Sequence, residues 1–340
     1  MGRLKVIQIG GEHDHAVPVL DSMVSQKDLF EVAAYALPED DATWQYNMYK
    51  DRFGDVPRLP LKEALELPGI QGAVIETSEK NLTKYARLAV DRGLAVHMDK
   101  PGGESPEEFA ELMETVKKKG TVFTLGYMYR FNPAVERLME MAKKGELGEI
   151  VSVEAQMNCI HRPEKRDWLK QYKGGMMFFL GCHLVDLIMQ LQGDPMEIVP
   201  MNVCSGLDGA EGEDFGLAML RYPHGWSIAK TTAVELGGFM RRQLVVCGTR
   251  ATVEINPLEY YISTGSREHM CADMVVTTRE LCDEKAWNAR GKKEVFGPVN
   301  RYDRMMAHFA RCAMEGKTDC TNWDYETRLH RAVMAASGAI

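Results

Sequence analysis

The stretch His97-Met98-Asp99-Lys100-Pro101-Gly102-Gly103 marks the end of a predicted strand and a sharp turn. Leu94-Ala95-Val96, just before it, indicates the strand, and Pro101 with the two glycines that follow stops it abruptly. Open α/β sheets hold their ligands beyond the carboxyl ends of the strands. Lys100 is therefore a candidate for contact with both a cofactor and a substrate. A solvated lysine beside a turn is the alternative that these residues leave open.

Alternating strands and helices surround this stretch in the first third of the chain. Apolar and β-branched runs that end at glycine or proline predict strands, and apolar residues at helical spacing predict helices. The predicted strands are 4–9, 30–37, 72–75, 94–98 and 121–125, and the predicted helices are 16–24, 61–67, 81–92 and 107–119. This alternation indicates a parallel sheet with helices on both faces.

Strand-like runs dominate the chain after residue 150. They are 150–156, 216–222, 226–234, 243–247 and 252–255, with helices at 181–191, 305–314 and 325–337. Consecutive strands of this kind indicate an antiparallel sheet. The sequence therefore predicts an α/β chain in two domains. A Rossmann-type parallel-sheet domain is expected at residues 1–126, and an α+β domain with a mainly antiparallel open sheet at 127–340, closed by helices in 301–340.

Composition excludes several classes of protein. The 340 residues are 45% hydrophobic and 26% charged, which suits two ordinary globular domains. A net charge of -8 argues against nucleic-acid binding, and no apolar run approaches the roughly 18 residues that a membrane span needs. The eight cysteines form no CxxC pair. We expect a cytoplasmic protein with reduced thiols that binds neither nucleic acid nor a membrane.

The turn after the first strand departs from the usual dinucleotide-binding pattern. A GxGxxG turn uses its glycines for a tight turn, for close approach of backbone to the diphosphate and for helix packing. Here Gly10-Gly11-Glu12-His13-Asp14-His15 fills only the first of the three glycine positions. A carboxylate from Glu12 would repel the diphosphate unless it turns away, or unless His13 or His15 compensates.

The end of the second predicted strand departs as well. An acidic residue usually binds the adenosine ribose hydroxyls there, but this chain has Leu37-Pro38, followed by Glu39, Asp40 and Asp41. Those carboxylates can take over the role, and they would repel a 2′-phosphate. If a dinucleotide binds, NAD is therefore favoured over NADP.

His13 and His15 also invite a metal interpretation. Two histidines on one turn, beside Glu12 and Asp14, are suitable ligand types. No preorganised ligand motif accompanies them, so the sequence predicts no metal site.

Several motifs, in order along the chain, resemble the glucose–fructose oxidoreductase / inositol dehydrogenase (Gfo/Idh/MocA) family. They are Thr77-Ser78-Glu79, Gly93, Asp99-Lys100-Pro101, Arg130-Phe131-Asn132-Pro133, the run 145–150, the run 174–186 and the run 246–255. The resemblance implies an NAD-dependent oxidoreductase that acts on a sugar, polyol or keto-sugar derivative. It also implies a homo-oligomer, a dimer or a tetramer, that uses one face of the second sheet.

The resemblance assigns acid and base roles to Lys100 and His183. Hydride transfer from a carbinol needs a base for the hydroxyl proton and a cation for the alkoxide. The cofactor-binding residues expected are Gly10, Gly11, Glu12, His13, Leu37, Glu76, Thr77, Ser78, Asp99, Lys100 and Pro101. The substrate-binding residues expected are Tyr129, Asn158, His161, Trp168, Tyr172, Cys182 and His183. Phe179 stands where the family usually has an aspartate, and a phenyl ring cannot orient or charge-balance His183.

Three alternatives remain open at this point. One is redox-assisted elimination at a glycoside with a retained cofactor, and another is a catalytically silent relative that binds a sugar-like ligand or a partner. The third is a metal cluster of Cys159, His161, Cys182 and His183. This cluster can form only if the loop before His183 folds back. Asp186, one helical turn after His183, is a possible replacement for the missing aspartate, although a structural role is the simpler interpretation.

Overall fold

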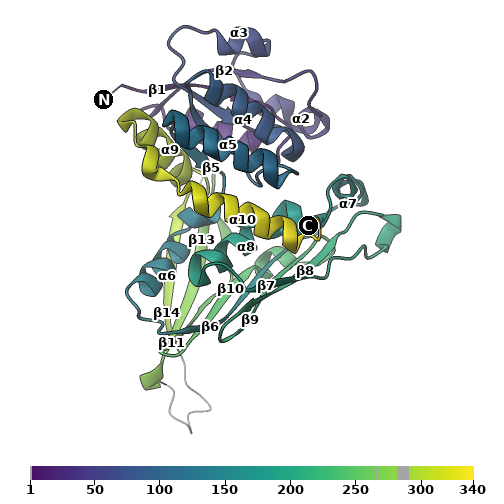
Figure 1. The fold of residues 1–340 in the computed structure, drawn as a ribbon, viewed down its shortest axis with the longest axis vertical. Helices are drawn as coiled ribbons and strands as arrows, with labels where there is room; N and C mark the ends of the chain where they lie inside the picture. The colour runs from purple at the N-terminus through teal and green to yellow at the C-terminus, as the bar shows by residue number, and fades with distance from the viewer. Residues whose placement is uncertain (1, 265–266, 282–290) are drawn as a thin grey trace. The chain divides into compact units, whose positions relative to one another are not determined.

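The computed structural model describes residues 2–264, 267–281 and 291–340. By the density of its internal contacts the chain divides into two units (Figure 1). The first contains the residues up to Met128 together with Tyr302–His330, and the second contains Tyr129–Arg301 and Arg331–Ile340. Most of the tail that was expected to close the second domain thus belongs to the first unit.

A five-stranded parallel sheet forms the centre of the first unit, in the order β2-β1-β3-β4-β5 (Figure 1). The strands are β1 (Leu4–Ile9), β2 (Phe30–Ala36), β3 (Gly72–Ile75), β4 (Ala95–Met98) and β5 (Phe123–Leu125). All five were predicted. The chain moves from β1 to β2 on one side and then crosses to β3 on the other, so the strand order reverses at β1. Ligands bind at such switch points in α/β sheets.

The helices of the first unit pack their apolar sides toward this sheet. They are α1 (Ala16–Ser25), α2 (Trp44–Tyr49), η1 (Lys50–Phe53), α3 (Leu61–Leu65), η2 (Glu79–Asn81), α4 (Leu82–Asp91), α5 (Pro106–Lys119), α9 (Asp303–Glu315) and η9 (Thr318–Cys320). Helix α5 has the expected ends, because Ser105 accepts a hydrogen bond from the N–H of Glu108 and Gly120 adopts the left-handed conformation. The sequence did not predict α2, which is short and has no apolar repeat.

The second unit is built on a mixed sheet in the order β12-β13-β11-β10-β6-β9-β8-β7, with β14 paired to β13. Its strands are β6 (Ile150–Asn158), β7 (Glu197–Pro200), β8 (Phe215–Tyr222), β9 (Gly225–Thr232), β10 (Gln243–Gly248), β11 (Ala251–Ile255), β12 (Tyr260–Thr264), β13 (Arg267–Thr278) and β14 (Lys292–Val299). Among the described strands of this second sheet, only β6 and β9 pair in parallel. The predicted fold class is confirmed.

Helical segments complete the second unit. They are η3 (Met128–Phe131), α6 (Pro133–Lys143), α7 (Pro163–Trp168), η4 (Leu169–Gln171), the π-helical turn η5 (Met177–Gly181), α8 (Cys182–Gln192), η6 (Leu207–Gly209), η7 (Gly238–Arg241) and η8 (Arg279–Leu281). The last helix, α10 (Trp323–Ala336), begins in the first unit and ends in the second. No helix in the described residues is both long and apolar enough to cross a membrane.

Candidate functional site

The turn between β1 and α1 approaches the end of β3 closely. Gly10 has a φ of +97°, and a Cβ built on it would lie 2.4 Å from the backbone nitrogen of Thr77. Both the positive φ and the lack of space require glycine at this position. Gly10, the one glycine of the dinucleotide-binding pattern that this sequence retains, is therefore required by the close contact between the ends of β1 and β3.

The Glu12 carboxylate is directed toward the start of α2. It accepts a hydrogen bond from the N–H of Gln45 at 2.9 Å and a longer one from the N–H of Tyr46 at 3.4 Å. Burial raises the pKa of Glu12 to about 7, although these two backbone N–H groups act in the opposite direction. From the sequence, either the Glu12 side chain turns away from a diphosphate, or His13 or His15 compensates its charge. In the structure the Glu12 side chain points away from the turn.

Side chains of the protein cover Gly11. A Cβ on this residue would lie 2.9 Å from Tyr46, 3.1 Å from Phe53 and 3.2 Å from Leu37. Leu37, predicted as a cofactor contact, thus packs against the glycine turn. Tyr46 and Phe53 come from α2 and η1, so this segment shapes the site in a way that sequence reasoning missed.

Two histidines and three acidic residues form a buried cluster at the ends of β1, β3 and β4. These residues are His13, His15, Glu76, Glu79 and Asp99. The His15 Nδ1 lies 3.1 Å from one oxygen of Asp99, and the His13 Nδ1 lies 3.5 Å from the same oxygen. The His13 ring also lies 3.7 Å from both Glu76 and Glu79. We call this group the His13 cluster.

Electrostatics in the His13 cluster follow from its burial. Burial lowers the pKa of His13 to about 3, so the ring is neutral at physiological pH. Burial and the neighbouring Asp99 raise the pKa of Glu76 well above its usual value. For Asp99, burial alone would raise the pKa, but the two histidines and Lys100 hold it well below the usual range.

Lys100 lies directly after β4 and is only 1% exposed. Its N–H donates to the Asp99 carboxylate at 2.7 Å, and its carbonyl oxygen lies 3.0 Å from the His13 Nε2. Its positive charge acts on both Asp99 and Glu76. The structure thus brings Lys100 together with Glu76, Asp99 and His13, all of which the sequence predicted as cofactor contacts.

The acidic residues after β2 are engaged with the segment that follows β3. Asp40 pairs with Lys84 and accepts a hydrogen bond from the hydroxyl of Tyr85. Asp41 accepts hydrogen bonds from the N–H of Ser78 at 3.2 Å and from the amide of Asn81 at 2.8 Å. Two of the three carboxylates that were expected to meet the adenosine ribose therefore already have protein partners.

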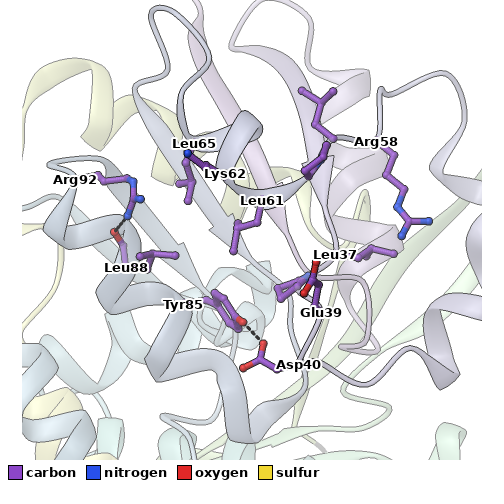
Figure 2. A pocket seen from close by; sticks show the side chains of 13 residues that line it. Leu37, Glu39, Asp40, Arg58, Leu61, Lys62, Leu65, Tyr85, Leu88 and Arg92 are labelled. Carbon is purple, nitrogen blue, oxygen red and sulfur yellow. Dashed lines mark hydrogen bonds between the residues drawn. The ribbon is translucent and has the colours of Figure 1, made fainter.

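A pocket of about 770 Å³ opens beside this segment (Figure 2). Its walls come from the end of β2, from α3 and the residues before it, and from α4. The lining residues are Leu37, Pro38, Glu39, Asp40, Arg58, Leu59, Pro60, Leu61, Lys62, Leu65, Tyr85, Leu88 and Arg92. Apolar walls with one aromatic ring suit a planar heterocycle, and three cationic side chains lie among the two carboxylates. Sequence reasoning missed these cations.

His183 lies in the second unit, at the start of α8 and just after the π-helical turn η5. Its side chain is buried, and its ring meets that of Tyr129 edge to face at a centroid distance of 5.0 Å. The Tyr129 hydroxyl hydrogen-bonds to Glu259, and it accepts from Arg242 at 2.9 Å and from Arg301 at 2.7 Å. A polar network thus holds the hydroxyl of Tyr129, a predicted substrate contact, while the Tyr129 ring packs against His183.

The position that usually carries an aspartate lies in an apolar cluster. Phe179 packs with Cys159, Leu169, Met176 and Ala233, and the Lys165 ammonium lies 4.5 Å from the centre of its ring. Arg130 donates to both oxygens of Asp186, at 2.9 and 2.7 Å. The structural interpretation of Asp186 fits this pairing.

The remaining predicted substrate contacts are mostly buried. The Asn158 amide donates to Glu235 at 2.6 Å, and the Tyr172 ring stacks on Phe178 at 5.2 Å. The Cys182 thiol contacts the carbonyl of Phe179, and the backbone of the half-buried His161 bonds to Ala233. Trp168 is half-buried against Tyr172. In the described part of the chain, the cysteines and histidines of this loop do not gather into a group with metal-ligand spacing.

Comparisons with known proteins identify the chain's relatives. It is 25% identical to D-xylose 1-dehydrogenase (NADP(+)) 2 of Haloferax volcanii over 257 residues, which cover 74% of this chain and 72% of that protein. It is 28% identical to the uncharacterized oxidoreductase YhhX of Escherichia coli over 219 residues, 63% of this chain and 60% of that protein. The second match thus spans less than two thirds of its relative.

A family model matches part of the second unit. Residues 135–254 match the GFO/IDH/MocA C-terminal domain. This part of the chain is therefore a Gfo/Idh/MocA C-terminal domain. The fold of the chain agrees, because levoglucosan dehydrogenase in complex with NADH and levoglucosan superposes with a TM-score of 0.78 at 14% identity, covering 99% of this chain and 98% of that one. The predicted family and the predicted enzyme class, oxidoreductase, are confirmed.

Members of the family use nicotinamide cofactors, and the relatives above include both an NADP(+) enzyme and an NADH complex. The residues of this chain fit such a cofactor in two places. The Glu12 carboxylate is withdrawn from the β1–α1 turn, and the pocket beyond β2 has room for a heterocycle. The three carboxylates of the His13 cluster are unusual neighbours for a diphosphate.

Proposed function

We propose that this protein is a nicotinamide-dependent oxidoreductase that transfers hydride to or from a hydroxyl-bearing carbon of a sugar, polyol or keto-sugar derivative. The observation that carries the proposal is Lys100, a buried cation directly after β4 and next to the switch point of a Rossmann-type sheet. The relatives with assigned substrates support a small carbohydrate, because one is a xylose dehydrogenase and another binds levoglucosan.

The cofactor would be held by the residues around the β1–α1 turn and by the pocket. Its adenosine half fits the pocket beside Leu37 and Tyr85, and its diphosphate would meet the backbone of the β1–α1 turn that begins at Gly10. When bound, the nicotinamide ring supplies the hydride acceptor or donor. Glu76, Thr77, Ser78 and the Asp99–Pro101 segment would then flank its nicotinamide half.

The choice between NAD and NADP depends on the pocket. Asp40 and Asp41 have protein partners, so the preference for NAD that we propose depends on Glu39. Arg58, Lys62 and Arg92 line the same pocket and would attract a 2′-phosphate. Parallel titrations with the two oxidised cofactors will measure the preference directly.

Lys100 and His183 are the proposed proton-transfer groups, each in its own unit. A protonated Lys100 stabilises the charge of an alkoxide, and the imidazole of His183 can accept or donate a proton. Phe179 carries no carboxylate that could orient His183. The Tyr129 ring, which meets the His183 ring edge to face, is the group that we propose orients it instead. His161, Trp168, Tyr172 and Cys182 remain the proposed contacts for the carbohydrate.

Cofactor titration of the purified protein tests this function. We expect a rise in melting temperature and enhanced NADH fluorescence, followed by turnover of one member of a sugar panel. Lys100→Met and His183→Asn should each lower kcat by about 10²–10⁴-fold, as loss of an acid–base group does. Lys173→Gln, at an exposed lysine paired to Glu213, serves as the control with unchanged kcat. No response to either cofactor at millimolar concentration would contradict the proposal.

A second candidate function follows from the carboxylates of the His13 cluster. Because they oppose a diphosphate, they favour a family member that binds a sugar-like ligand without turnover. That protein would gain melting temperature with a carbohydrate but not with a cofactor. Redox-assisted elimination at a glycoside would instead need a cofactor and would release the aglycone without net reduction of added NAD.

A homo-oligomer, dimer or tetramer, is also proposed from the family resemblance. Light scattering after size-exclusion chromatography measures the mass directly, and a mass of 38.3 kDa for the particle would contradict this proposal.

A further inference from the structure

We propose that His13, His15, Asp99 and Glu76 form a binding site for a divalent transition-metal ion of the zinc class. The four residues come from the β1–α1 turn and from the ends of β4 and β3, and all lie within the first unit. The site goes beyond the proposed oxidoreductase function, since it requires neither a cofactor nor a carbohydrate.

The spacing of the ligand atoms matches a tetrahedral site. Nitrogen and oxygen ligands of Zn²⁺ lie about 2.0–2.2 Å from the ion, which places them about 3.4 Å from one another. The Asp99 oxygen lies 3.1 Å from the His15 Nδ1 and 3.5 Å from the His13 Nδ1. The Glu76 oxygen lies 3.7 Å from the same nitrogen of His13. One ligand atom from each of His13, His15 and Asp99 lies within 4.8 Å of the other two.

Hydrogen bonding prepares His13 to act as a ligand. Its Nε2 lies 3.0 Å from the carbonyl oxygen of Lys100, so Nε2 carries the proton and Nδ1 carries the lone pair. Histidines that bind metals typically donate their second ring N–H to a carbonyl in this way. In this structure the Nδ1 lone pair accepts a hydrogen bond from the N–H of His15 at 3.1 Å. An ion would replace that contact.

Glu76 provides an independent observation. Its side chain is fully buried, and in the described part of the chain no N–H or hydroxyl group donates to either carboxyl oxygen; its hydrogen-bonding neighbour is another acid, Asp99. Buried polar groups in native proteins are almost always hydrogen-bonded, and an exception calls for an explanation such as an absent ion. The carboxylate lies next to His13 and Asp99, where a metal ion would give it a partner.

The charges of the cluster fit a divalent ion. Glu76, Glu79 and Asp99 bring three acidic side chains to this site, and the charge of Lys100 acts on Glu76 and Asp99. With His13 neutral, a doubly charged ion that replaces the proton of Glu76 balances the carboxylates beside it. Two imidazoles with two carboxylates suit zinc, cobalt or iron better than calcium or magnesium, which prefer oxygen ligands.

The test begins with the cofactor-free protein after treatment with EDTA. We expect calorimetric titration with ZnCl₂ to give one site per chain, and CoCl₂ to give a visible absorption band without the charge-transfer band of a thiolate ligand. MgCl₂ should produce no response. Because no cofactor is present, failure of this site and failure of the oxidoreductase proposal are separate outcomes.

Variants assign the ion to its ligands. A second group, His308, Cys312 and Cys320, also has metal-ligand spacing, so it is the matched control. His15→Asn and Glu76→Gln should each weaken Zn²⁺ binding at least tenfold, whereas Cys312→Ser with Cys320→Ser should leave it unchanged. His15 is the variant least at risk of misfolding, because its side chain is 11% exposed.

Two results would overturn the proposal. One is the absence of a zinc-dependent heat or cobalt absorption in the wild-type protein, which needs no variant to interpret. The other is binding that survives His15→Asn and Glu76→Gln and disappears only when Cys312 and Cys320 are replaced.

Discussion

Each unit of this protein buries a charged cluster, and the two clusters are satisfied to different degrees. In the second unit Glu259 is fully buried and receives hydrogen bonds from Tyr129, Arg242 and Arg301. In the first unit Glu76 is buried equally deeply, but no N–H or hydroxyl group of the described residues donates to its oxygens, and its hydrogen-bonding neighbour is the acid Asp99.

This difference indicates which cluster stabilises the fold and which one we expect to bind a ligand. A buried carboxylate whose charge is balanced by cations of its own chain requires no ligand. Its removal destabilises the fold, because it leaves the desolvated charges of its partners uncompensated. A buried carboxylate without donors destabilises the ligand-free fold, and the surrounding structure must tolerate that cost. Unsatisfied groups of this kind concentrate at sites that bind something. The Glu259 network therefore positions side chains, and the His13 cluster is where we expect ligands.

The same substitution at both carboxylates is the strongest test of this comparison. Glu259→Met should lower the free energy of unfolding of the second unit by about 3–5 kcal/mol, because it removes the counter-ion of the buried Arg242 and of the partly buried Arg301. Chemical denaturation followed by circular dichroism measures the loss. Glu254→Met on the exposed side of β11 is the control, with a change of about 0.5 kcal/mol or less. A loss at Glu259 as small as that of the control would remove the contrast.

Acid should weaken the Glu259 network. Burial alone would raise the pKa of Glu259, but Arg301 and Arg242 hold it below the usual value. A carboxyl whose pKa is depressed in the folded state stabilises at a pH above its unfolded value, about 4.3, and loses this effect as the pH falls through the folded value. The stability difference between the wild type and Glu259→Gln should therefore shrink below about pH 4. A difference that grows in acid would mean that the sign is wrong.

Glu76→Met should act in the opposite direction to Glu259→Met. In EDTA-treated protein, replacing an unsatisfied buried carboxyl with an apolar chain of similar size should raise the free energy of unfolding by about 1–3 kcal/mol. The same variant should lose the stabilisation that Zn²⁺ gives to the wild type. A loss of stability without metal would show that Glu76 has a structural partner and would make the two clusters alike.

The smallest effect is expected at an exposed ion pair. Arg221 and Glu197 lie 2.8 Å apart, with about half of each side chain in solvent. Arg221→Ala should cost about 0.2–1 kcal/mol, and the cost should fall as salt is added. A loss as large as that of Glu259→Met would show that burial is not what distinguishes the two networks.

Local patterns predicted the fold well where they were strong. The strands β1, β3 and β4 are short apolar runs closed by turn residues, and α5 has both of its end signals, Ser105 and Gly120. The helix α2 escaped prediction because six residues without an apolar repeat give no periodic signal. Its backbone N–H groups nevertheless decide where the Glu12 carboxylate points.

The sequence by itself determined the α/β fold class, the resemblance to the Gfo/Idh/MocA family, and the position of Lys100 directly after a strand of the parallel sheet. These follow from periodicity and from motifs, which are local. Only the tertiary structure decided that His13 meets Asp99 and Glu76, and that His15 meets Asp99. The physical reason is that parallel strands bring residues more than 60 positions apart to one edge, and burial there sets which charges lack a partner.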